Sequence, residues 1–167
     1  MQIKTIDKQI YQTRSRKSYL GISAILIISS LLWSTIFIAL FSTSDDNFRY
    51  NLLGVVTAVI CLIPIITYCK SKTWFAEVMY VWHLKQELNK INRKMVKLQK
   101  AASKGEVEAL TAIKFSYIGS RQIWELDDNT LMLSELSLAE QKLDVLIDKF
   151  NVSIEPAQYQ SNDLMKY

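Results

Sequence analysis

Two long apolar runs fill most of the first seventy residues. The first extends from Leu20 to Phe41 and the second from Leu52 to Cys69, and neither contains a charged side chain. Because a helix rises about 1.5 Å per residue, each run is long enough to cross a hydrocarbon layer about 30 Å thick. The first run is too long for a signal-peptide core and no small-residue cleavage site follows it. We therefore predict a transmembrane hairpin over residues 19–69, with spans at about 20–41 and 51–69.

After residue 70 the apolar positions recur in alternating steps of three and four. This spacing predicts a helix that packs along its whole length against another helix. Gly105 follows the pattern and suits the left-handed conformation that ends many helices. The seam consists of Val81, Leu84, Leu88, Ile91, Met95, Leu98 and Ala102.

Two shorter helices are predicted at residues 106–126 and about 134–150. The turn-forming residues 127–130 separate them, and a polar stretch with Pro156 follows Val152. We expect residues 70–152 to form a cytoplasmic helical bundle and residues 153–167 to be a flexible tail. The fold class is thus an all-α membrane protein: a two-helix transmembrane hairpin, a long heptad-bearing helix and two shorter helices.

The distribution of charge predicts the orientation. Basic residues precede the first span and follow the second, whereas the short connection between the spans carries Asp45 and Asp46 against Arg49. Positive charge concentrates on the cytoplasmic side of membrane proteins, so both termini should be cytoplasmic. The basic residues expected at lipid headgroups are Arg14, Arg16, Lys17, Lys70 and Lys72.

Residues 1–18 form a basic segment before the first span. Ile3, Ile6 and Ile10 would share one side of a helix, with Lys4 and Lys8 elsewhere. Such a pattern favours a short amphipathic helix on the inner leaflet, and a disordered basic tail is the alternative. At the other end of the hairpin, residues 69–73 contain no Gly or Pro, so the second span could continue into the heptad helix as one rod.

Small and hydroxyl side chains inside the spans are candidates for helix packing. Small residues let two helix backbones approach closely in lipid, and hydroxyls can bond across helices or back to their own helix. The contact could join the two spans or two subunits, and the serines could instead line a narrow pore. The candidates are Gly54, Thr57, Ala58 and Cys61 in the second span, and Ser23, Ser30 and Ser34 in the first.

The chemistry-bearing residues give weak patterns only. The single histidine, His83, has Met79 and Glu87 one turn away, which makes a poor metal site. The acids Asp127 and Asp128 are better explained as the cap of the third cytoplasmic helix. Basic residues of the heptad helix spread around its polar faces, so we expect no nucleic-acid partner. We predict no catalytic residue, no cofactor and no metal ion.

Three stretches of the chain carry a resemblance. They are NFRYNLLGVV at 47–56, FAEVMYVWHLKQELNKI at 75–91 and WELDDNTL at 124–131. Together they resemble a family of short bacterial inner-membrane proteins that is catalogued as a domain of unknown function. The resemblance implies a bacterial plasma-membrane location, two spans and a helical cytoplasmic part, and it implies no activity, cofactor or site residue.

These features predict a membrane-anchored scaffold or accessory subunit that has no catalytic activity of its own. Its expected partners are membrane lipids, further copies of the chain and another membrane protein. Trp74, Phe75, Val78 and Trp82 add apolar surface that three modest helices do not easily cover, which favours a homo-oligomer. The alternative is a small oligomeric channel or transport-associated protein. An enzyme ranks third, because no nucleophile–base pair or phosphate loop occurs.

Overall fold

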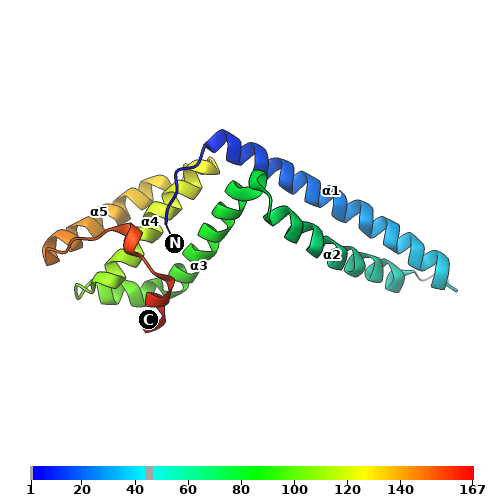
Figure 1. Ribbon diagram of the computed structural model, residues 1–167. Helices are drawn as coiled ribbons and strands as arrows, with labels where there is room; N and C mark the ends of the chain where they lie inside the picture. The colour runs from blue at the N-terminus through cyan, green and yellow to red at the C-terminus, as the bar shows by residue number, and fades with distance from the viewer. Residues whose placement is uncertain (1, 44–46) are drawn as a thin grey trace. The chain divides into compact units, whose positions relative to one another are not determined.

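The computed structural model describes residues 2–43 and 47–167 and is built of helices, with no strand among these residues (Figure 1). The prediction of an all-helical chain with two long apolar helices first is confirmed. The elements are α1 (Lys8–Phe41), α2 (Phe48–Lys70), η1 (Thr73–Phe75), α3 (Ala76–Ala102), α4 (Val107–Leu126), α5 (Leu133–Phe150), η2 (Pro156–Gln158) and η3 (Ser161–Lys166).

The chain forms two compact units. One combines the described residues of 1–8 with residues 80–167, and we call it the helical unit. The other contains residues 9–79, and we call it the apolar hairpin. The N-terminal segment therefore belongs to the same unit as α4, α5 and the C-terminal tail.

The apolar hairpin contains the two helices that are long and apolar enough to cross a membrane. α1 has 34 residues and α2 has 23, which correspond to lengths of about 51 and 35 Å. Their outward side chains are apolar and exposed: Leu31, Leu32 and Ile60 are each about three-fifths exposed. In water such a surface would be costly, whereas acyl chains solvate it well.

The N-terminal segment differs from the predicted amphipathic helix. Ile3 and Ile6 precede the start of α1 at Lys8, in a stretch without helical structure. The backbone N–H of Lys4 donates to the Tyr80 hydroxyl at 2.8 Å, and the Gln122 side chain donates to the Lys4 carbonyl at 2.6 Å. These bonds hold the segment against the helical unit. They also satisfy the backbone N–H and carbonyl of Lys4, which have no helical partner.

The second span does not continue into the heptad helix as a rod. α2 runs through Pro64 and ends at Lys70. Lys72 then takes an extended conformation (φ −91°, ψ 141°), and the short turn η1 leads into α3. The absence of Gly and Pro from this segment was therefore a poor guide, since an extended residue of any type can interrupt a helix.

α4 lies at the centre of the helical unit (Figure 1). It contacts both α5 and η2. On its α3 side, Gly119 approaches Leu84 and Leu88 so closely that an added Cβ would lie 3.2 and 3.0 Å from their methyl carbons. Residues 109–113 are buried without a break, so α4 is covered on several sides and not on one face only.

The C-terminal tail is ordered, which corrects the prediction of a flexible segment over 153–167. It contains η2 and η3, and Tyr159 and Leu164 are almost fully buried. In Figure 1 the tail leaves the end of α5, passes α4 and reaches α3. The prediction failed because the tail is polar on average, and two widely spaced apolar side chains are enough to anchor it.

Candidate interaction surface

The two apolar helices approach each other most closely where Gly54 meets Ser34. A Cβ added to Gly54 would lie 2.2 Å from the Ser34 Oγ and 2.7 Å from its Cα. The Ser34 hydroxyl lies 3.3 Å from the Asn51 carbonyl oxygen of α2, to which it donates. Of the alternatives that the sequence left open, contact within one chain therefore accounts for Gly54 and Ser34.

The other small residues of the spans divide between the hairpin interior and its outer surface. Ala58, one turn after Gly54 on α2, is fully buried. Thr57 is half-buried and Cys61 is exposed. Ser23 is also exposed. Ser30 is half-buried, and its hydroxyl donates to the Leu26 carbonyl one turn back at 2.6 Å, so it serves its own helix.

The basic residues next to the spans have different environments. Arg14 forms an ion pair with Glu77 inside the apolar hairpin, so lipid headgroups would have to compete with a carboxylate for it. Lys72 places its Nζ 4.2 Å from the centre of the Tyr68 ring. Arg16, Lys17 and Lys70 are exposed. Asp45 and Asp46, the acids of the predicted connection, lie outside the described residues.

The heptad seam faces the interior of the helical unit. Six of its residues are buried and Met95 is half-buried. At Gly119 the seam meets α4 of the same chain, as Leu84 and Leu88 show. This apolar surface is thus covered within one copy of the chain.

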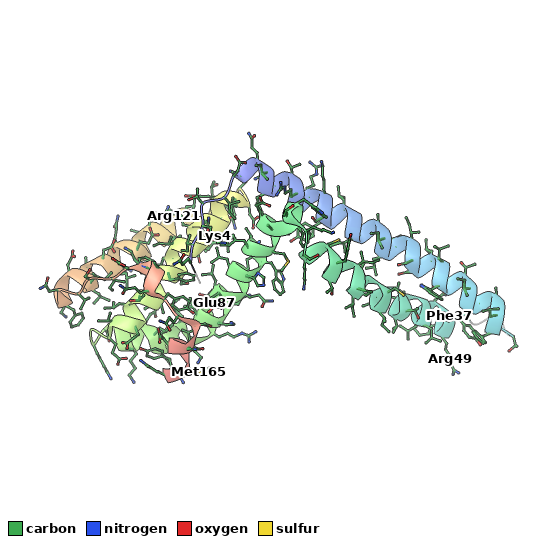
Figure 2. All side chains as sticks on the ribbon, viewed as in Figure 1. Lys4, Phe37, Arg49, Glu87, Arg121 and Met165 are labelled. Carbon is green, nitrogen blue, oxygen red and sulfur yellow. The ribbon has the colours of Figure 1, made fainter. Side chains whose placement is uncertain are left out.

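Glu87 is a buried carboxylate on α3, only 7% exposed, and three groups surround it. The Tyr159 hydroxyl donates to its Oε1 at 2.8 Å, and the Lys90 ammonium lies 2.9 Å from its Oε2. Burial alone would raise the pKa of Glu87, but hydrogen bonds from Ser161, Lys90 and Tyr159 outweigh burial and lower the pKa. Glu87 is thus kept ionised, and Figure 2 shows it on the side of α3 that the tail crosses.

Tyr159 is one of the two buried residues that anchor the tail. Its ring stacks on Phe115 of α4 with centroids 4.4 Å apart. Burial, together with the hydrogen bond and the charge of Glu87, raises the pKa of Tyr159 far above its usual value, so the hydroxyl stays protonated and can donate. No sequence pattern predicted this cluster. An aromatic residue in an otherwise polar tail was the one available indication.

The acidic residues after α4 do not cap α5, which corrects that prediction. Asp127 directly follows the last residue of α4. The N-cap of α5 is Met132, whose side chain makes no capping hydrogen bond. Asp127 instead pairs with Lys85 at 2.8 Å, and Asp128 pairs with Lys8. These ion pairs connect three separated parts of the chain within the helical unit.

The residues weighed as metal ligands are not brought together. His83 is exposed, and its ring packs edge to face against Trp82 with ring centroids 5.0 Å apart. The Glu87 carboxylate instead accepts a hydrogen bond from Tyr159 of the tail. Across residues 2–43 and 47–167, no group of three or more His, Cys, Asp and Glu side chains is arranged to hold a metal ion.

A groove of about 480 Å³ opens between α3 and α5, with α4 as its floor. Its surface is mainly apolar, and the polar side chains Gln99, Tyr117, Glu135 and Lys142 lie around it. The α5 wall contributes Leu138, which is 58% exposed. The remaining apolar lining residues are Ala102, Ile113, Ala139, Leu143 and Leu146. This groove is the strongest candidate for an interaction surface in the helical unit.

A family described as "Protein of unknown function (DUF3087)" matches residues 1–164. The chain belongs to this family. The DUF3087 match covers the apolar hairpin and the helical unit, including nearly all of the tail. We found no match to this DUF3087 chain among curated proteins or among solved structures.

Proposed function

We propose that this protein is a membrane-anchored helical interaction subunit that associates with further copies of itself. It has no catalytic activity of its own, it resides in a bacterial plasma membrane, and both of its termini are cytoplasmic. The observation that carries the proposal is the combination of two apolar helices with an exposed, mainly apolar groove in the helical unit. The first would hold the protein in lipid, and the second offers an apolar surface to a partner.

The N-terminal segment supports the orientation. Residues 2–8 belong to the helical unit, and Lys4 and Lys8 bond there to Gln122 and Asp128. The start of α1 and the end of the chain would therefore lie on one side of the membrane, as a two-span hairpin requires. The basic residues around the outer ends of the spans favour the cytoplasmic side.

A channel draws less support than an interaction subunit. The hydroxyls of Ser29, Ser30 and Thr67 donate to carbonyls of their own helices at 2.6 to 2.9 Å. The small face around Gly54 packs against the first span. A pore would need some of these groups to face water.

Native mass spectrometry of the full chain in mild detergent tests the proposed function. A homo-oligomeric mass, or a complex of fixed stoichiometry with a second protein, supports an interaction subunit. A strictly monomeric protein without a bound partner contradicts it. Purified protein that passes ions across liposome membranes would favour the channel instead.

A further inference from the structure

One flank of α5, together with Met132 just before it, carries a row of apolar and charged residues, most of them exposed. We call this row the α5 stripe. Leu138 is 58% exposed and Val145 is 66% exposed, although both are large and apolar. The stripe consists of Met132, Glu135, Leu138, Ala139, Lys142, Val145 and Leu146, and five of these residues line the groove.

The charges of the stripe differ from the other charges of α5. Glu140 pairs with Arg121 of α4, and Asp144 pairs with Lys114. Those carboxylates hold α5 against α4. By contrast, Glu135 and Lys142 are exposed, and neither forms an ion pair with another residue in the described part of the chain. Their separation of seven residues, about 10.5 Å along the helix, also prevents them from pairing with each other.

The stripe is complementary to itself when it is reversed. A twofold axis between Leu138 and Ala139 would place Glu135 opposite Lys142 of a second copy, and Lys142 opposite its Glu135. The same axis places Leu138 opposite Ala139, so a large side chain meets a small one. Further out, Met132 falls opposite Val145. A twofold interface requires this kind of self-complementarity, and here it holds for charge, size and polarity together.

We propose that two copies of this chain associate through an antiparallel pairing of their α5 stripes. The inference rests on the proposed function and identifies the surface that would perform it. Leu138 and Ala139 lie at the axis, and each of the two Glu135–Lys142 pairs closes one side of the contact. The partner's Leu138 covers the apolar wall of the groove, which removes exposed apolar area from water.

The other surfaces first considered for association are covered within one chain. The heptad seam packs inside the helical unit, and the face around Gly54 packs against Ser34. A lipid surface is a poorer match for the stripe, because membrane-binding helices carry excess basic charge and here Glu135 balances Lys142. Confinement of the anchored chains to one membrane would also raise their effective concentration.

Cysteine cross-linking in membranes tests the direction of the pairing. In the full chain with Cys61→Ser and Cys69→Ser, Leu138→Cys brings two thiols together at the axis. Val145→Cys lies on the same stripe, but the antiparallel register separates the two copies of this residue by about 20 Å along the axis. We expect a disulfide-linked dimer with Leu138→Cys and none with Val145→Cys. Cross-linking of both variants would indicate a parallel pair, and cross-linking of neither would exclude the interface. Either result overturns the proposal.

Charge exchange tests the register in mild detergent. Glu135→Lys and Lys142→Glu should each weaken dimerisation about tenfold, because both pairs become repulsive. The double exchange should restore dimerisation to within about twofold of the wild type. Arg93→Glu on the exposed side of α3 is the control and should have no effect. Far-ultraviolet circular dichroism confirms that each variant folds.

The outcomes separate this proposal from the proposed function. If the wild type is a dimer and none of the three charge exchanges changes its dimerisation, the α5 interface is overturned but self-association is not. A strictly monomeric wild type overturns both. A hetero-oligomer overturns the pairing of two copies and leaves the protein an accessory subunit.

Discussion

The bond between Tyr159 and Glu87 gives a direct test of how the tail is held. Tyr159→Phe keeps the ring that stacks on Phe115 and removes only the hydroxyl that donates to Glu87 at 2.8 Å. A hydrogen bond to a buried charged group contributes about 1.5–3 kcal/mol. Since 1.4 kcal/mol corresponds to a factor of ten, the open form of the tail should become about ten to a hundred times more populated.

Hydrogen exchange of the full chain in detergent measures this opening. The backbone N–H of Tyr159 donates to the Pro156 carbonyl at 3.2 Å, and its exchange reports release of η2. Tyr167→Phe is the matched control, because the Tyr167 hydroxyl donates to an exposed Glu106 that water can solvate. We expect little change in that variant. Exchange of the tail at the wild-type rate in Tyr159→Phe would refute the claim that this bond holds the tail.

Two further predictions concern the hairpin and the effect of pH. Gly54→Ala should lower the thermal stability of the purified protein because the added Cβ would overlap Ser34. Gly21→Ala is the control and should leave the stability unchanged, because no atom lies within 4 Å of its added Cβ. Equal stability of the two variants would contradict the close approach of the helices at Gly54. The pKa of Glu87 is lowered in the folded state, so its contribution is complete above about pH 4.5 and is lost as the pH falls through the lower folded value. Tail opening, corrected for the intrinsic pH dependence of exchange, should therefore increase in acid, and Glu87→Gln should reduce that dependence. The remainder is expected from Glu108, whose pKa is also lowered and which pairs with Lys166 of the tail. An unchanged acid response in Glu87→Gln would contradict this assignment.

The sequence was most informative where a long pattern repeats. Uncharged runs of about twenty residues predicted the two apolar helices, and the alternating spacing of the heptad seam predicted which side of α3 is buried. Such patterns are reliable because many residues have to agree before they appear. By contrast, no repeating pattern marks the start of α1 at Lys8 or the bond of Lys4 to Tyr80, and neither could be read from the sequence.

Single contacts between distant residues were not predictable. Tyr159 is 72 residues from Glu87, and no spacing rule relates a tail residue to the third helix. Similarly, Asp127 resembled the cap of the following helix, but it ends α4 and pairs with Lys85. The small-residue pattern did predict close packing at Gly54, although only the structure identifies Ser34 as the neighbour. The fold was thus more accessible than the candidate site.

Cysteine labelling of intact cells tests the two-pass topology directly. In the full chain with Cys61→Ser and Cys69→Ser, single cysteines are introduced as Gln2→Cys, Thr43→Cys and Ser153→Cys, all at exposed positions. A membrane-impermeant maleimide should label only Thr43→Cys before the inner membrane is permeabilised, and all three afterwards. Labelling of Gln2→Cys or Ser153→Cys in intact cells, or protection of Thr43→Cys, would contradict a hairpin with both termini in the cytoplasm.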